Sequence, residues 1–139
     1  MEIGGSLRVY MENTTTAPVI NKTMAYFREE CQKQGINSNM TLAVFYDWSY
    51  EEGAQIRWDV FTIVPENIEV KPPLKIAPFE KIKVLAYTYQ GPPTVAEIEK
   101  TYKFLRGYLK EKGLQHTWPE YELFLKEPRR MNIFLRWKE

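Results

Sequence analysis

Residues 81–128 read KIKVLAYTYQGPP, then TVAEIEKTYKFLRGYLKEKGLQ, then HTWPEYELFLKEP, and this stretch decides the fold. Its first part is rich in β-branched and aromatic residues and predicts a strand over residues 82–89 that ends at Gly-Pro-Pro. The middle part has helical periodicity and predicts a helix over residues 95–112. The last part predicts a strand over residues 121–126, and the sequence beyond it predicts a closing strand over residues 131–137.

The predicted helix has clear boundaries. Thr94 is the expected N-cap, because a threonine hydroxyl accepts a hydrogen bond from the first helical turn. Gly113 is the expected stop, because glycine readily adopts the left-handed conformation that ends many helices. Between these limits the apolar residues recur at steps of four, three and four, which predicts one buried stripe: Ile98, Tyr102, Leu105 and Leu109.

The same unit occurs earlier in the chain. Its strands are predicted over residues 6–12, 41–48 and 55–64, and its helix over residues 17–34, with Gly35 as the stop. The helix stripe has the same spacing as the later one: Ile20, Met24, Phe27 and Cys31. The two stop glycines are 78 positions apart (113 minus 35), and at this offset further residues coincide: Leu7 with Leu85, Arg28 with Arg106, and Tyr46 with Phe124. We therefore predict an internal duplication.

These elements predict a single α+β domain over residues 1–139. It consists of two pseudo-symmetric β-α-β-β halves, residues 6–65 and 81–137, joined by a proline-rich connector over residues 66–80. The sheets are expected to be mainly antiparallel, with the helices on one face. Two such halves placed side by side leave a ligand cleft between them on the other face.

The composition limits the classes of function. The chain has 19 basic and 18 acidic side chains, a formal net charge of +1 and no cluster of like charges, so nothing electrostatic indicates nucleic acid or a membrane surface as partner. The N-terminus lacks a signal segment and no apolar run is long enough to cross a bilayer, so we expect a cytoplasmic protein without membrane contact. Cys31 is the one cysteine, which excludes an internal disulfide.

Strand alternation assigns side chains to the two faces of the sheet. The more apolar set is expected to pack against the helices: Val60, Thr62, Leu123, Leu125, Ile133, Leu135 and Trp137. The other set is expected to line the cleft: Asp59, Phe61, Ile63, Leu85, Tyr87, Tyr89, Glu122, Phe124, Asn132 and Phe134. Aromatic rings beside two acids, Asp59 and Glu122, are typical of a small-molecule site and would suit a lipophilic cation.

The order and spacing of several motifs resemble the GyrI-like effector-binding domains. The segments that carry the resemblance are YQGP at residues 89–92, YLKEKGL at 108–114, YELFLKEP at 121–128, AVFYDW at 43–48 and WDVFTIVP at 58–65. This family forms the ligand-binding domains of multidrug-responsive transcription regulators, also occurs alone, and is related to the SOUL haem-binding proteins.

The resemblance implies a stand-alone small-molecule-binding protein, with a ligand cleft between the two halves and an anchoring glutamate in the last strand. Asn132 stands at the position of that glutamate, so Asp59 or Glu122 has to supply the charge for a cation. A neutral aromatic or amphipathic ligand is the alternative. The AVFYDW motif adds Tyr46 and Trp48 to the predicted ligand-binding residues.

Two other functions stay open. A small hydrolase would use Glu122 or Asp59 as general base, with Tyr46, Tyr87 or Tyr89 as hydroxyl donor. A protein-interaction module would dock a protein partner, or a second copy as a homodimer, on the open sheet face. The sequence has no metal-ligand spacing and no phosphate-binding loop, so we expect no cofactor and favour a binding protein over an enzyme. No helix-turn-helix segment precedes the first strand, so we expect no direct DNA binding.

Overall fold

The computed structural model describes residues 1–49, 51–90, 94–124 and 130–139, with the backbone alone for Val95 and Arg130. The helices within these ranges are η1 (Ala17–Val19, a short 3-10 helix), α1 (Ile20–Lys33) and α2 (Val95–Glu111). The strands are β1 (Glu2–Ile3), β2 (Ser6–Thr15), β3 (Thr41–Phe45), β4 (Ile56–Val64), β5 (Lys75–Phe79), β6 (Ile82–Gln90), β7 (Gln115–Phe124) and β8 (Arg130–Lys138).

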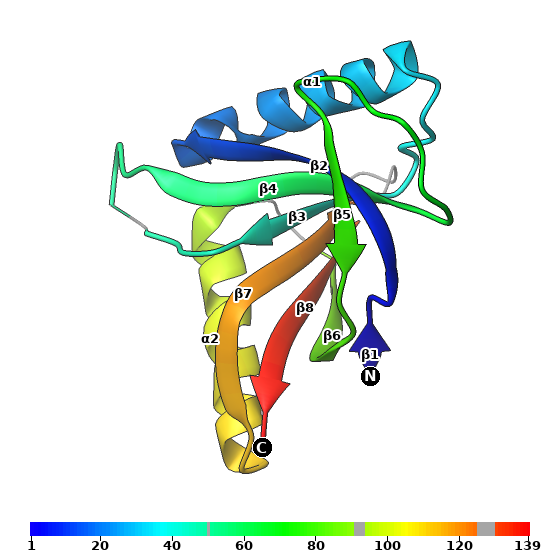
Figure 1. Ribbon diagram of the computed structural model, residues 1–139. Helices are drawn as coiled ribbons and strands as arrows, with labels where there is room; N and C mark the ends of the chain where they lie inside the picture. Colours follow the sequence, from blue (N-terminus) through cyan, green and yellow to red (C-terminus); the bar gives the residue numbers. More distant parts are fainter. Residues whose placement is uncertain (50, 91–93, 125–129) are drawn as a thin grey trace.

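All these strands belong to one antiparallel sheet in the order β1-β6-β8-β7-β3-β4-β2-β5 (Figure 1). The order is symmetric about the pairing of β7 with β3, because β6-β8-β7 on one side has the same arrangement as β2-β4-β3 on the other. We call this pairing the seam; at its middle, Ala43 lies opposite Glu122. The predicted α+β fold with mainly antiparallel strands is confirmed.

The edge strands are exchanged between the halves. β1 precedes the first half in sequence but pairs with β6 of the second, whereas β5 lies in the predicted connector and pairs with β2 of the first. Pro78 fits in β5 because an edge strand tolerates a missing N–H. Gly4 and Gly5 join β1 to β2 with φ angles of +98° and +96°, and a Cβ on Gly4 would lie 2.0 Å from the carbonyl oxygen of Glu80. Gly4 is therefore required at this close approach of two chain segments.

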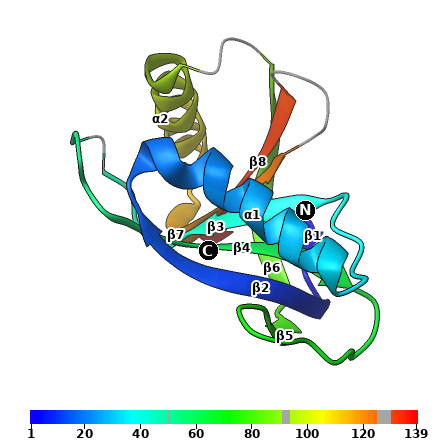
Figure 2. The same ribbon diagram turned by 90° about the horizontal axis from the view of Figure 1, so that it is seen from above.

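The helices lie within a residue of their predicted limits, apart from the 3-10 turn that begins the first one. The predicted stripes are confirmed as buried or, for Ile98, partly buried: Ile20, Met24, Phe27, Cys31, Ile98, Tyr102, Leu105 and Leu109. The Thr94 hydroxyl accepts a hydrogen bond from the Glu97 backbone N–H, whereas Thr16, the N-cap of η1, makes no such bond. In Figures 1 and 2, α1 lies over β2 and β4, and α2 lies against the half formed by β7 and β8.

Apolar side chains cover both faces of the sheet. On the face that carries the helices (the helix face), one core forms under α1 around Phe27 and Trp58, and another under α2 around Leu105 and Ile133. The opposite face (the far face) has its own cluster, drawn from both halves: Leu42, Val44, Phe61, Phe79, Ile82, Val84, Tyr121, Leu123 and Phe134. The sheet is therefore buried on both sides along much of its length.

The face assignment of β7 is corrected by the structure. Glu122 and Phe124 lie on the helix face, because Glu122 is paired with Ala43 of the α1 core and Phe124 packs against both helix cores. Leu123, which the sequence places under the helices, lies in the far-face cluster. Leu125 lies outside the described residues. The error arises because both faces are apolar, so that alternation separates two sets of side chains without showing which set meets the helices.

The same ambiguity affects β6, whereas the faces predicted for β4 and β8 are confirmed. Tyr87 and Tyr89 lie on the helix face, since they are paired with residues of the α2 core on β8, and Leu85 shares this face. The offset of 78 relates the two helices well but does not extend to the next strands. Tyr46 packs against the far-face cluster while Phe124 is on the helix face, so these two positions are not equivalent.

Candidate functional site

A cavity of about 220 Å³ lies on the helix face at the seam. Side chains of η1, α1 and α2 form its walls, and β3, the segment after β3, β7 and β8 contribute the others. We call it the seam cavity, and its lining is mostly apolar: Ala17, Pro18, Ile20, Asn21, Phe45, Trp48, Ile98, Tyr102, Glu120, Glu122, Phe124 and Met131. Both halves of the chain are therefore needed to build it.

Glu122 is the acid of this lining that forms no ion pair with a described basic side chain. It is only 8% exposed, and its Oε2 atom is buried without a hydrogen-bond partner among the described residues. Burial, and secondarily the neighbouring Glu120, raise the pKa of Glu122 to about 8, while a hydrogen bond with Tyr102 acts in the opposite direction. At neutral pH the carboxyl group is mostly protonated, and a cation placed beside it would favour the ionised form.

Glu120 lies two residues earlier on the same face of β7, but its surroundings differ. Nη2 of Arg106, on α2, donates a hydrogen bond to Glu120 Oε1 at 2.5 Å, and the carboxylate is buried. His116 Nε2 is 3.1 Å from the same oxygen, although the orientation of the ring does not make a hydrogen bond. Arg106 therefore neutralises Glu120, while Glu122 has no such basic partner in the part of the chain that the structure describes.

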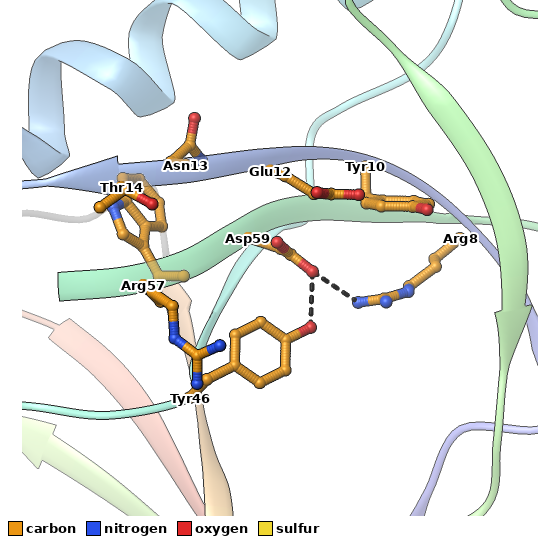
Figure 3. Close-up of a pocket in the computed structure, with 9 residues that line it drawn as sticks. Arg8, Tyr10, Glu12, Asn13, Thr14, Tyr46, Arg57 and Asp59 are labelled. Atoms are coloured by element: carbon orange, nitrogen blue, oxygen red, sulfur yellow. Dashed lines mark hydrogen bonds and ion pairs between the residues drawn. The ribbon is translucent and has the colours of Figure 1, made fainter.

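A second cavity, of about 560 Å³, lies on the far face, where Figure 3 shows side chains from β2, β4 and the segment after β3. The Tyr46 hydroxyl donates a hydrogen bond to Asp59 Oδ2 at 2.5 Å, and Arg8 Nη1 lies 3.7 Å from the same oxygen. Burial raises the pKa of Asp59 against the effects of Tyr46 and Arg8. Burial and the bond to Asp59 raise the pKa of Tyr46 to about 12.

The charges around this far-face cavity are paired. Glu12 Oε1 is 3.0 Å from the Nζ of Lys75, and Arg57 Nε is 3.4 Å from a carboxylate oxygen of Asp47. With the contact between Arg8 and Asp59, each acid among the described lining residues has a basic partner. The acids of this broad, polar cavity are thus paired, in contrast to Glu122 of the seam cavity, although the Nε atom of Arg8 is buried without a hydrogen-bond partner among the described residues.

The structure divides the ten predicted ligand-binding residues between the two faces. Trp48, Glu122 and Phe124 line the seam cavity. Tyr89 is buried under α2, and Tyr87 lies on the same face but is 40% exposed. The other five lie on the far face: Tyr46, Asp59, Phe61, Asn132 and Phe134.

The far-face residues do not form one site. Phe61 and Phe134 are buried within the apolar cluster. The Thr88 hydroxyl donates a hydrogen bond to Asn132 Oδ1 at 2.8 Å. Tyr46 and Asp59 do come together, and they are one of the acid and hydroxyl pairs predicted for a hydrolase, but the hydroxyl donates to the carboxylate itself.

Sequence reasoning missed nine of the twelve described residues that line the seam cavity. Tyr102 and Ile98 belong to a helix stripe, and helical spacing alone does not separate a stripe residue in the core from one beside a cavity. Glu120 could have been predicted beside Glu122, because residues 120 and 122 of one strand must share a face. Its partner Arg106 could not, since the contact depends on how α2 lies against β7.

Other reactive groups are sparse in the part of the chain that the structure describes. There, no cluster of three or more His, Cys, Asp and Glu side chains could hold a metal ion. No helix in the described ranges is long and apolar enough to cross a membrane. Cys31 is buried in the α1 core, and burial raises the pKa of its thiol to about 11, so this cysteine stays protonated and unreactive at neutral pH.

Comparison with protein families agrees with this architecture. The model of the GyrI-like small molecule binding domain matches residues 3–136, which is nearly the whole chain. The chain belongs to this family. The resemblance inferred from the sequence motifs is therefore confirmed, and the GyrI-like chain is a small-molecule-binding domain. No curated protein sequence matches it.

Solved structures share the fold of this GyrI-like domain at low identity. The crystal structure of the EcmrR C-terminal domain has a TM-score of 0.79 at 13% identity, and the match covers 100% of this chain and 95% of that chain. SAV2435 bound to tetraphenylphosphonium has a TM-score of 0.59 at 11% identity, with 99% and 93% covered.

A third structure contains DNA. In the cryo-EM structure of the EcmrR-DNA complex the TM-score is 0.74 at 13% identity, and the match covers all of this chain but 56% of the EcmrR chain. At these identities the likeness shows the fold alone. The expectation that this chain does not bind DNA directly therefore stays a prediction.

Proposed function

We propose that this GyrI-like domain binds a compact aromatic cation in the seam cavity, with Glu122 as the counter-ion. The observation that carries the proposal is the buried Oε2 atom of Glu122, which has no hydrogen-bond partner among the described residues and borders an apolar cavity. A buried polar atom without a partner is costly. A positively charged ligand would remove that cost, and it would gain an ion pair in a region of low dielectric constant.

The remaining lining supports an aromatic cation over an inorganic one. Phe45, Trp48, Tyr102 and Phe124 line the same cavity as the acid. Aromatic rings attract organic cations. A metal ion would require several oxygen or nitrogen ligands, and the apolar lining does not provide them. SAV2435, which shares the fold, has been solved with tetraphenylphosphonium, itself a lipophilic aromatic cation.

The matched probes are benzyltrimethylammonium and its uncharged carbon isostere, neopentylbenzene. Binding is measured at pH 9, where Glu122 is mostly ionised, by calorimetry and by tryptophan fluorescence. The wild-type domain is expected to bind the cation at least tenfold more tightly than the isostere. Glu122→Gln, which keeps the shape and removes the charge, is expected to abolish this preference.

Asp59→Asn is the control, because it removes the corresponding charge from the far-face cavity. It should leave the preference for the cation unchanged. If Glu122→Gln keeps the preference and Asp59→Asn loses it, the ligand binds on the far face and the proposal is wrong.

A further inference from the structure

Arg106 is held firmly beside the seam cavity without lining it. Its Nη2 atom donates to Glu120 Oε1 at 2.5 Å. Its guanidinium lies over two rings, with the central carbon 5.3 Å from the centroid of Tyr102 and 5.9 Å from that of Trp118. A hydrogen bond and two ring contacts together fix the position of the guanidinium.

This position determines how many negative charges the cavity presents. Glu120 and Glu122 both line it, and no basic side chain stands among its described lining residues. With Arg106 in place, the charge of Glu120 is neutralised from behind, so that Glu122 alone is available to a ligand. Without Arg106, the imidazole of His116, whose Nε2 is 3.1 Å from Glu120 Oε1, would remain beside Glu120, and two neighbouring carboxylates would face the same small space.

We propose that Arg106 restricts the seam cavity to singly charged cations by neutralising Glu120. The inference rests on the proposed function, since it concerns which cation the same cavity accepts. A dication would bring its second charge towards a carboxylate that is already paired and towards the guanidinium behind it. Repulsion between like charges in a desolvated cavity then opposes binding. Arg106 is thus a positioning residue that acts through Glu120.

The test compares benzyltrimethylammonium with xylylene-bis(trimethylammonium), which carries a second trimethylammonium group on the same ring. The ratio of the two affinities, measured by calorimetry at pH 9, reports the charge selectivity. The wild-type domain is expected to prefer the monocation at least tenfold. Arg106→Gln is expected to reverse the preference, because Glu120 becomes available to the second ammonium group.

Lys103→Gln is the matched control on the same helix. Lys103 pairs with Glu99 at 3.6 Å, and its side chain is largely exposed. Its loss removes one positive charge from α2 without touching Glu120, so the wild-type ratio should persist. A ratio that is unchanged in Arg106→Gln, or that shifts equally in Lys103→Gln, overturns the inference.

A double variant, Arg106→Gln with Glu120→Gln, covers the case in which Arg106→Gln alone does not fold. It replaces the ion pair by two amides and leaves Glu122 as the one acid of the cavity. The inference expects the double variant to bind the monocation and to regain the preference for it over the dication. Loss of monocation binding in the double variant would show that Glu120 is itself the anchor. Failure of this inference can be told apart from failure of the proposed function. If the proposed function is wrong, Glu122→Gln with Arg106 intact still prefers the cation over its uncharged isostere.

Discussion

Two glutamates of one strand, separated by a single residue, have opposite electrostatic surroundings. Glu120 is buried against the guanidinium of Arg106, whereas Glu122 is buried against aromatic rings and the carboxylate of Glu120. One acid is therefore paired with a base, and the other changes its charge near neutral pH. The strand supplies both because positions 120 and 122 project from the same face.

This contrast predicts a pH-dependent stability. Folding raises the pKa of Glu122 from its ordinary value of 4.5 to about 8, so the folded state holds a proton that the unfolded state releases between these values. The stability that the protonated group contributes is fully present below pH 4.5 and is lost as the pH rises through 8. At about 1.4 kcal/mol for each tenfold change in the acid constant, the loss is on the order of 5 kcal/mol.

Glu122→Gln cannot ionise and is expected to escape this loss. Its melting temperature should exceed that of the wild type by a margin that grows from pH 5 to pH 9. If the difference in melting temperature between the variant and the wild type stays constant from pH 5 to pH 9, the carboxyl group does not titrate in the folded state over this range.

A second residue-scale prediction concerns the far face. Tyr46→Phe removes the 2.5 Å hydrogen bond to Asp59 and should reduce the free energy of unfolding by about 1–3 kcal/mol, the range for a bond to a buried charged group. Urea denaturation measures this change, with Tyr10→Phe at the same cavity as the control. The affinity for benzyltrimethylammonium should not change, because Tyr46 is on the other face from the seam cavity. A matching loss of affinity would indicate that the two faces are coupled.

At the scale of elements, the two helices start differently. Thr94 accepts a hydrogen bond from the Glu97 backbone N–H, while Thr16 makes no side-chain cap. Thr94→Ala should therefore cost about 1 kcal/mol, and Thr16→Ala should cost almost nothing. Denaturant midpoints of the two variants check this difference, and equal costs would mean that the cap of α2 contributes no stability.

The elements also show what sequence can and cannot predict. Helix stripes such as Phe27 and Leu105 were predictable because each helix has one apolar side and one solvated side. Strand faces were predictable in β4, where Asp59 alternates with Val60 and Trp58, but not in β7. In β7, Leu123 packs on one face and Phe124 on the other, and both environments are apolar. The alternation pattern therefore does not show which face of the sheet meets the helices.

At the scale of the whole molecule, the far-face cluster joins the halves. Phe61 comes from the first half and Tyr121 from the second, and their ring centroids are 6.3 Å apart. Because neither half buries these rings alone, the domain is expected to unfold in one cooperative transition. The seam cavity depends on the same assembly, and this is why it could not be derived from either half of the sequence.

Phe61→Ala tests this cooperativity. Phe61 is fully buried, so its truncation should cost about 3–5 kcal/mol and lower the stability of both halves together. Phe104→Ala, at a ring that is 64% exposed on α2, is the control and should change stability by less than about 0.5 kcal/mol. Two separate transitions in the urea denaturation curve of Phe61→Ala would mean that the halves unfold independently.

The exchange of edge strands has a practical consequence. A chain cleaved between β4 and β5 yields two fragments joined by three antiparallel pairings, because β1 stays with β6, β5 with β2, and β3 with β7. Neither fragment contains a complete cavity, since Trp48 and Glu122 end up on different pieces. A cation in the seam would then bridge the fragments and promote their reassembly. Reporter halves fused at the cut would convert this domain into a split biosensor for the molecules that it binds.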